Sequence, residues 1–297
     1  MHFVFSPPAG PAAGLLTLPW RSSVEDWTDD RVVEIRQRGL SRHVVRFVSE
    51  GGEIFALKEL DERLARREYA LLRQLQQLEI PAVDVLGIVV DRPDNLDAVL
   101  VTRFLDYSTS YRALFANPRG GPLADRLLDA QVELLVRLHL AGFMWGDCSL
   151  SNTLFRLDAG ALSAYLVDAE TGELHPTLSD GQRGYDVELA QERVGGELFD
   201  LQAGGLLPSD VDPVAFADEI ARRYEASLER MRSEGATVIE FPLAEKQKWL
   251  AAMPDIATPW IEATERRGIP AGEALRAYLN AIRARGGMPL RDWDRPR

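Results

Sequence analysis

Short apolar runs alternate with polar residues through the first third of the chain, and this pattern predicts β-strands. The expected strands cover residues 32–35, 44–48, 54–58, 83–90 and 97–104. Gly51-Gly52 separates the second and third runs, and glycine accepts the positive φ that a tight hairpin turn needs. The turn signal Arg92-Pro93-Asp94-Asn95 separates the last two runs. The pattern therefore predicts strands that are joined by turns.

A leucine stripe follows the third strand and predicts a helix over residues 61–78. The stripe consists of Leu64, Leu71, Leu75 and Leu78. Asp61 is placed to cap the first turn of this helix, because its side chain can accept hydrogen bonds from the first backbone amides. Ile80-Pro81 ends the helix, since proline disfavours helical geometry at the residue before it.

Helical patterns dominate the rest of the chain. An amphipathic helix is expected over residues 124–141, followed by a loop and short strands over 143–170. Asp212-Pro213 is typical of a helix start, and a last helix is expected over 271–285. Strands early in the chain and helices late predict an α+β fold.

The composition bounds the class of protein. The chain has 297 residues, which is enough to bury a sizeable core, and its single cysteine, Cys148, excludes an internal disulfide and a cysteine-rich metal site. The net charge of −12 repels phosphate backbones, so nucleic acid is not an expected partner. The first twenty residues lack the pattern of a signal peptide, and no run approaches the ~20 apolar residues of a membrane helix. We therefore expect a cytoplasmic protein without integral membrane association.

One stretch carries the residue types that phosphoryl transfer requires. In Gly146-Asp147-Cys148-Ser149-Leu150-Ser151-Asn152, an aspartate precedes an asparagine by five positions, and Asp168 follows at the end of an apolar run. Phosphoryl transfer needs a carboxylate near the acceptor hydroxyl and oxygen ligands for Mg²⁺. Asp147 can supply the first, and Asn152 with Asp168 can supply the second. The alternative is a turn rich in Asp, Ser and Asn that only bends the chain and caps helices.

Glu68 breaks the leucine stripe of the first helix. At 100° per residue its side chain falls on the apolar face, where a carboxylate is costly unless it is paired. Lys58, at the end of the third strand, is the natural partner. The alternatives are a Glu68 side chain that reaches water from the edge of the stripe and a Lys58 that is solvated.

Together these residues resemble the protein-kinase superfamily. The spacing from Asp147 to Asn152 matches that family's catalytic loop, and Asp168 matches its metal-binding aspartate. The resemblance implies a bilobal α+β fold, with a small antiparallel N-lobe that carries one helix and a mostly helical C-lobe. It also implies ATP and magnesium as cofactors, with Asp147, Lys58 and Glu68 in catalytic roles and Asn152 and Asp168 as metal ligands.

The resemblance further implies a nucleotide site between the lobes. Gly39 and Ser41 lie where kinases place the loop that covers the phosphates, although this loop has a single glycine. Thr102 would be the gatekeeper, and backbone groups of Arg103 and Leu105 would meet adenine. Asp186 resembles an aspartate that holds the backbone of the catalytic loop, and a helix N-cap is the alternative.

Several positions depart from standard protein kinases. Trp145 replaces the usual histidine, Ser149 stands where a lysine is usual, and Asp168 is followed by Ala169-Glu170. These departures resemble RIO-type atypical kinases and bacterial lipopolysaccharide kinases. Glu170 is either an extra metal ligand or a solvated carboxylate. Cys148 is expected to be a buried filler, because no histidine near it in sequence could activate it.

The resemblance divides the chain into four parts. These are an N-terminal arm (1–30), an N-lobe (31–105), a C-lobe (106–205) and a helical C-terminal region of unknown function (206–297). The arm is expected to be irregular and held by Trp20 and Trp27. The C-terminal region carries no motif, and a protein partner is one role open to it.

Three functions remain open from sequence. The first is an ATP- and magnesium-dependent phosphotransferase that acts on an unidentified hydroxyl-bearing acceptor, either a lipopolysaccharide- or sugar-like molecule or a protein. The second is a nucleotide-binding pseudokinase that serves as a scaffold, which Trp145 and Ala169-Glu170 motivate. The third is an adenylyl-transferring enzyme on the same fold.

Overall fold

The structure is a computed structural model, and it divides the chain into two compact units, Met1–Ala236 and Thr237–Arg297. The residues that it describes are 1–5, 11–35, 43–116, 123–158, 160–233, 255, 257–284 and 293.

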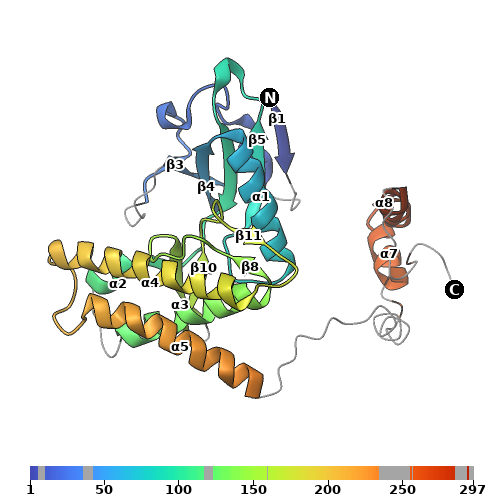
Figure 1. Ribbon diagram of the computed structural model, residues 1–297. Coiled ribbons are helices and arrows are strands. Elements are labelled where there is room, and N and C mark those ends of the chain that lie inside the picture. Colours follow the sequence, from blue (N-terminus) through green and yellow to red (C-terminus); the bar gives the residue numbers. More distant parts are fainter. Residues whose placement is uncertain are drawn as a thin grey trace. The chain divides into compact units, whose positions relative to one another are not determined.

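A six-stranded antiparallel sheet forms one end of the first unit (Figure 1), with strand order β1-β5-β6-β4-β3-β2. Its strands are β1 (His2–Phe5), β2 (Val32–Val33), β3 (Val44–Glu50), β4 (Glu53–Leu60), β5 (Val85–Val90) and β6 (Ala98–Arg103). All five expected strands are present, although the first is shorter than expected. Gly51 and Gly52 have φ angles of 60° and 84°, which confirms the expected hairpin turn between β3 and β4.

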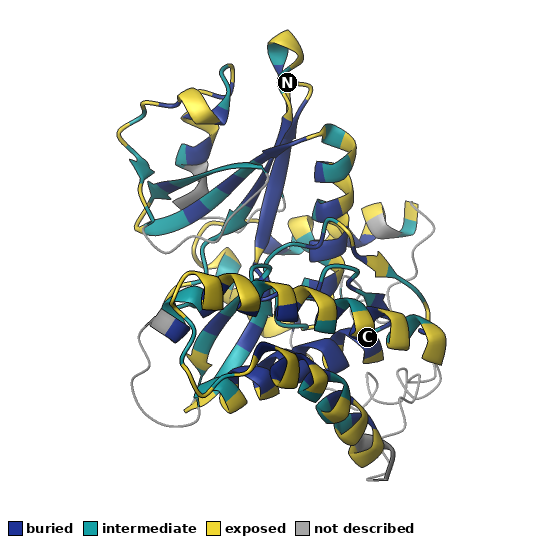
Figure 2. Ribbon diagram, turned by 60° about the vertical axis from the view of Figure 1, so that its left-hand side comes forward, coloured by how far each residue is buried: buried dark blue, intermediate teal, exposed yellow. Residues whose placement is uncertain are grey.

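Helix α1 (Glu62–Gln77) packs on this sheet as the leucine stripe predicts. The Asp61 carboxylate accepts hydrogen bonds from the backbone amides of Arg63 and Leu64, so the expected N-cap is confirmed. Its buried face includes Leu71 and Leu75, whereas Leu78, the last residue of the expected stripe, follows the helix and is exposed. Figure 2 shows this division, with buried residues along one side of the helix and exposed residues along the other.

The first thirty residues contain more structure than the irregular arm that we expected from sequence. Strand β1 pairs with the edge of β5, and two short 3₁₀-helices, η1 (Pro11–Thr17) and η2 (Val24–Asp26), follow it. Trp20 and Trp27 are buried, as expected, and their rings meet edge to face 5.2 Å apart. Strand β1 escaped prediction because its pairing partner is more than eighty residues away, and four residues carry little periodicity.

A buried cation fastens this segment to the sheet. Arg92 lies under it, and its guanidinium donates to the backbone carbonyls of Trp20 and Ser22 and to the Glu59 carboxylate on β4. Glu59 in turn accepts from the Ser23 hydroxyl at 2.7 Å. Burial of these charges is tolerated because each is paired and hydrogen-bonded.

The other end of the first unit is mostly helical. Its helices are α2 (Tyr111–Ala116), α3 (Leu123–Leu140), α4 (Asp180–Ala203) and α5 (Pro213–Ser233). Its short strands are β7 (Thr109–Ser110), β8 (Phe143–Met144), β9 (Thr153–Asp158), β10 (Ala161–Leu166) and β11 (Glu173–Leu174). In the six-stranded sheet at the first end, a 3₁₀-turn, η3 (Pro93–Asn95), joins β5 to β6. Helices α3 and α5 confirm the expected ones, and Asp212 caps α5 by accepting from the amides of Val214 and Ala215. The expected α+β fold, with an antiparallel N-terminal sheet and a helical C-terminal part, is confirmed.

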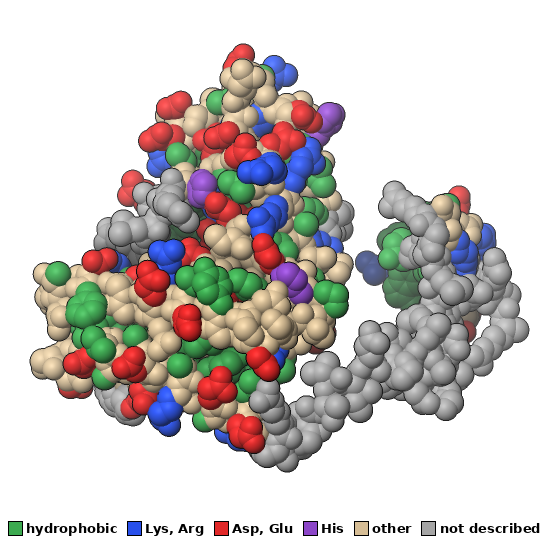
Figure 3. All heavy atoms as spheres, viewed as in Figure 1, with side chains coloured by type: hydrophobic (Ala, Val, Ile, Leu, Met, Phe, Trp, Pro, Cys, Tyr) green, Lys and Arg blue, Asp and Glu red, His purple; other side chains and the backbone are tan. Residues whose placement is uncertain are grey.

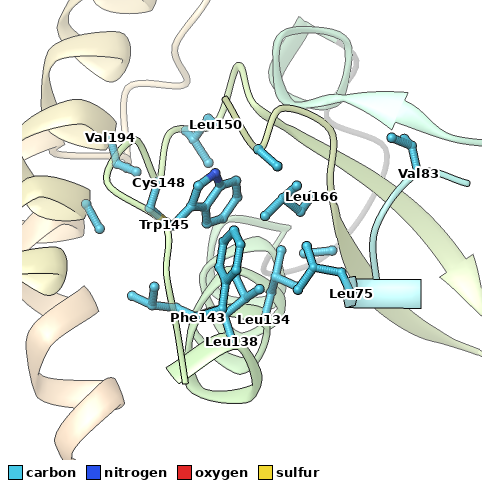
Figure 4. Packing of buried hydrophobic residues seen from close by; sticks show 14 of the residues in the cluster. Leu75, Val83, Leu134, Leu138, Phe143, Trp145, Cys148, Leu150, Leu166 and Val194 are labelled. Carbon is cyan, nitrogen blue, oxygen red and sulfur yellow. The ribbon is translucent and has the colours of Figure 1, made fainter. Parts of the chain in front are cut away.

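A continuous apolar core joins the two ends of this unit. Leu75 of α1 and Val83 belong to the same buried cluster as Leu134 of α3, Trp145 and Leu166. Figure 4 shows the Trp145 ring among these side chains. The backbone also crosses at this point, because Val83 donates its amide to the Leu166 carbonyl at 2.9 Å. This core supports the loop that carries Asp147.

The described part of the second unit contains α7 (Ala257–Glu265) and α8 (Ala271–Ala284), the latter close to the expected helix over 271–285. Among the described helices of the whole chain, none combines the length and apolar character needed to cross a membrane. In the view of Figure 3, acidic and basic side chains are interleaved over the surface of the first unit. The negative charge on this face is therefore spread over both ends of the unit.

Candidate active site

A cavity of about 1020 Å³ lies within the first unit, between the sheet and the helical end. Eight residues expected at the site line it: Lys58, Glu68, Thr102, Arg103, Leu105, Asp147, Asn152 and Asp168. Gly39 and Ser41 lie outside the described residues. The structure thus brings together side chains that are up to 110 positions apart in the sequence.

Lys58 is the electrostatic centre of the cavity. It lies on β4, and its Nζ atom is 3.0 Å from Glu68 Oε2 and 2.7 Å from Asp168 Oδ2. The ion pair with Glu68 that the stripe position predicts is confirmed, and the Glu68 side chain is only 1% exposed. A third carboxylate, Glu170, approaches Lys58 Nζ to 3.4 Å and lies 2.8 Å from His43 Nε2 on the other side. Glu170 therefore faces the cluster instead of solvent.

The surroundings shift the pKa values of this pair. Burial opposes the charge on Lys58, but the carboxylates of Glu68 and Asp168 outweigh it and hold its pKa above the usual range. Burial, and then the negative charge of Asp168, raise the pKa of Glu68 to about 7 despite the opposing effect of Lys58. One ammonium group thus serves a cluster with an excess of negative charge.

Asp147 and Asn152 also line the cavity and contact each other. The Asn152 amide nitrogen donates to Asp147 Oδ2 at 3.0 Å and to the Asp147 carbonyl at 3.2 Å. These two bonds orient the amide so that its oxygen, the atom that suits a hard cation, turns away from Asp147. The backbone joins Asn152 to the Asp168 segment, because Val167 donates its amide to the Asn152 carbonyl at 3.0 Å.

The loop that carries Asp147 is held from below by Asp186. This residue is fully buried, and its carboxylate accepts from the amides of Trp145 at 2.7 Å and Gly146 at 2.8 Å. Asp186 lies inside α4, whose N-cap is Ser179, so the alternative that Asp186 is an N-cap is wrong. His139 Nε2 also lies 3.0 Å from this carboxylate, and His139 Nδ1 is 2.7 Å from Tyr224 Oη on α5.

Comparison with known proteins gives a family for this arrangement. The family model described as "Lipopolysaccharide kinase (Kdo/WaaP) family" matches residues 31–188, which is more than half of the chain. The chain belongs to the lipopolysaccharide kinase (Kdo/WaaP) family. Its fold is accordingly the bilobal protein-kinase-like fold.

The chain was also compared with solved structures and with curated proteins. A solved structure titled "WaaP in complex with acyl carrier protein" is similar over 67% of this chain and 88% of its own, with 17% sequence identity and a TM-score of 0.41. No curated protein matches the chain.

In this member of the lipopolysaccharide kinase family, Trp145 has a structural part to play. The ring is fully buried, and its Nε1 atom donates to the Asp168 carbonyl at 2.9 Å. Its own carbonyl accepts from the Thr171 hydroxyl at 2.9 Å. Trp145 thus ties the loop that carries Asp147 to the segment that carries Asp168.

Sequence reasoning missed the contribution of α4 to the site. Glu197 accepts from the amides of Leu150 at 2.7 Å and Ser151 at 3.0 Å, and Arg193 lies 3.3 Å from Asp147 Oδ1. Burial raises the pKa of Glu197. Both residues lie beyond the segment that the family model matches. The one available signal was the seven-residue spacing from Asp186 to Arg193, which places both on one helix face.

The expected adenine contacts lie on β6 and just after it. Thr102 lines the cavity, and the Arg103 amide donates to the Asp84 carbonyl at 2.8 Å. That bond engages the Arg103 amide within the sheet. Leu105 also lines the cavity, and its carbonyl accepts from Ser108.

Cys148 is predicted to be chemically inert in the folded protein. Its side chain is fully buried, Gln131 donates to its sulfur at 3.2 Å, and burial raises the pKa of the thiol. Since the thiolate is the reactive form, a disulfide reagent such as DTNB should label no thiol under native conditions and one per chain in urea. Rapid labelling of the native protein would contradict this burial.

Proposed function

We propose that this chain is an ATP- and magnesium-dependent phosphotransferase whose acceptor is a hydroxyl group. The observation that carries the proposal is the Lys58 ammonium, which bridges Glu68 and Asp168 within one cavity that Asp147 and Asn152 also line. Family membership and this geometry support a kinase, and a lipopolysaccharide- or sugar-like hydroxyl compound is the first acceptor class to test. A protein acceptor is the second.

In the proposed reaction, the acceptor oxygen forms a bond to the γ-phosphorus of ATP. The bond between that phosphorus and the β–γ bridging oxygen breaks, and ADP leaves with the oxygen and the electron pair. The hydroxyl proton passes to the Asp147 carboxylate, and Lys58 neutralises charge on the α- and β-phosphates. Trp145 and Asp186 hold the loop so that Asp147 keeps its position.

The donor atoms of the site fit a magnesium ion. The Asn152 amide oxygen and the Asp168 carboxylate are hard oxygen donors on one cavity, which is the ligand type that Mg²⁺ prefers. A magnesium ion held there would neutralise phosphate charge. The Lys58 ammonium and the Glu170 amide hydrogen-bond to Asp168 and fix its orientation.

Thermal unfolding with nucleotide tests the proposed binding. ATP with Mg²⁺, at a hundred times its dissociation constant, should stabilise the protein by about 2.7 kcal/mol. The Asp168→Asn variant should lose the part of this stabilisation that depends on magnesium, whereas Asp218→Asn, an exposed carboxylate on α5, should keep it. Absence of any shift with ATP, with or without Mg²⁺, would contradict nucleotide binding.

Transfer of radioactive phosphate from ATP then tests catalysis. The acceptors are lipopolysaccharide core sugars, a protein mixture and the chain itself. Turnover with any of them supports the phosphotransferase. ATP binding without turnover on all of them would favour the nucleotide-binding pseudokinase, and product mass separates phosphoryl from adenylyl transfer.

A further inference from the structure

We propose that Arg193 is a catalytic cation, which contacts the phosphoryl group during transfer and stands in for the lysine that the catalytic loop lacks. This inference rests on the proposed phosphotransferase function. It concerns a residue on α4, outside the segment that the family model matches.

One face of α4 follows the catalytic loop. Asp186, Arg193 and Glu197 are spaced by seven and four residues, and this spacing places them on the same side of a helix. They contact the loop in chain order: Asp186 at Trp145 and Gly146, Arg193 at Asp147, and Glu197 beyond Asp147. The carboxylates of Asp186 and Glu197 hold the two ends of the loop, and the Arg193 guanidinium lies between them, beside Asp147.

The loop itself carries no cation between Asp147 and Asn152. Ser149 stands at the position where protein kinases usually have a lysine, and its hydroxyl is engaged within the loop, because it accepts from the backbone amide of Asn152 at 3.1 Å. Among the residues that the structure describes, Arg193 brings a positive charge next to Asp147 instead.

The other described cations on the cavity wall serve different groups. Lys58 is surrounded by three carboxylates on the nucleotide side. Arg103 pairs with Glu53 at 2.9 Å, and the Arg112 guanidinium lies 5.8 Å from the centre of the Tyr111 ring. Among the described cations of the cavity wall, Arg193 is thus the one that lies beside Asp147, where the acceptor hydroxyl would react.

The Arg193 side chain is 54% exposed, so it can move without breaking the core. Before substrate binds, it neutralises Asp147. When ATP and the acceptor bind, the guanidinium donates to the γ-phosphoryl oxygens, for which its planar fork is suited. Asp147 is then released to accept the proton of the hydroxyl that attacks the γ-phosphorus, while ADP leaves with the bridging oxygen and its electron pair.

Calorimetric binding of ADP and of ADP with aluminium fluoride, both with Mg²⁺, tests this role without an acceptor. The second ligand mimics the phosphoryl group in flight, so a transition-state contact appears as extra affinity for it. Arg193→Ala should bind ADP as the wild type does and bind the aluminium fluoride complex about 100-fold more weakly. Arg193→Lys should recover part of the loss. Arg222→Ala on α5, whose side chain is 66% exposed, is the matched control and should change neither affinity.

Each result decides something. Equal binding of the aluminium fluoride complex by Arg193→Ala and wild type would overturn the role of Arg193 and leave the proposed function standing. Parallel weakening of both ligands, or a lowered melting temperature, would assign Arg193 a structural part and also overturn it. A wild-type protein that binds neither ligand would contradict the proposed function itself.

Discussion

Lys58→Met is expected to abolish phosphate transfer and to destabilise the fold. The substitution leaves Glu68 buried without its cation, and breaking a buried pair in this way costs about 3–5 kcal/mol. Because the pKa of Glu68 is already raised to about 7, the carboxyl can escape part of this cost by taking up a proton. In the variant, the protonated form of Glu68 avoids an unpaired buried charge, and this form is lost as pH rises. The destabilisation should therefore be larger at pH 8 than at pH 5. Urea unfolding at the two pH values measures the effect.

A double variant separates stability from chemistry. Lys58→Met combined with Glu68→Met replaces the pair by apolar side chains of similar size and should regain much of the lost free energy of unfolding, without regaining phosphate transfer. Arg66→Met is the control on α1: its pair with Glu62 is about half exposed, so the change should be less than about 1 kcal/mol. A Lys58→Met protein as stable as wild type at pH 8 would contradict this account.

Asp186→Ala is expected to be the most damaging change away from the cavity. The carboxylate accepts from the buried Trp145 amide and the part-buried Gly146 amide and lies beside His139, so its loss leaves several polar groups without a partner. Each unsatisfied buried group costs about 1–3 kcal/mol, and a total near 4 kcal/mol is expected from urea unfolding. Phosphate transfer should fall as well, because the same amides position the loop.

The control for Asp186 lies two residues away. Glu188→Ala removes a carboxylate from the same helix, but one that is exposed to solvent. It should change the free energy of unfolding by less than about 0.5 kcal/mol. If Asp186→Ala and Glu188→Ala unfold at the same urea concentration, then Asp186 does not hold the loop.

Part of the site could be predicted from sequence because a charged side chain interrupts an apolar helix face. Glu68 is a carboxylate on a leucine face, and that local conflict is readable from spacing alone. Asp147, Asn152 and Asp168 could be predicted because they lie close together in the sequence, at a characteristic spacing.

The contributions from far along the chain were not readable. Arg193 and Glu197 reach the loop because α4 folds back beneath it, and no local pattern encodes that return. Strand β1 was missed for the same reason, since only its pairing with β5 makes four residues into a strand.

The pairing of β1 has a consequence for shortened versions of the protein. All six residues of β5, from Val85 to Val90, are buried, and β1 covers the outer edge of that strand. A chain cut at residue 31, where the family match begins, would keep every proposed catalytic residue but leave a hydrophobic strand with open hydrogen-bonding groups. Such an edge pairs readily with another copy of itself, so we expect the shortened chain to aggregate more readily than the chain that keeps β1.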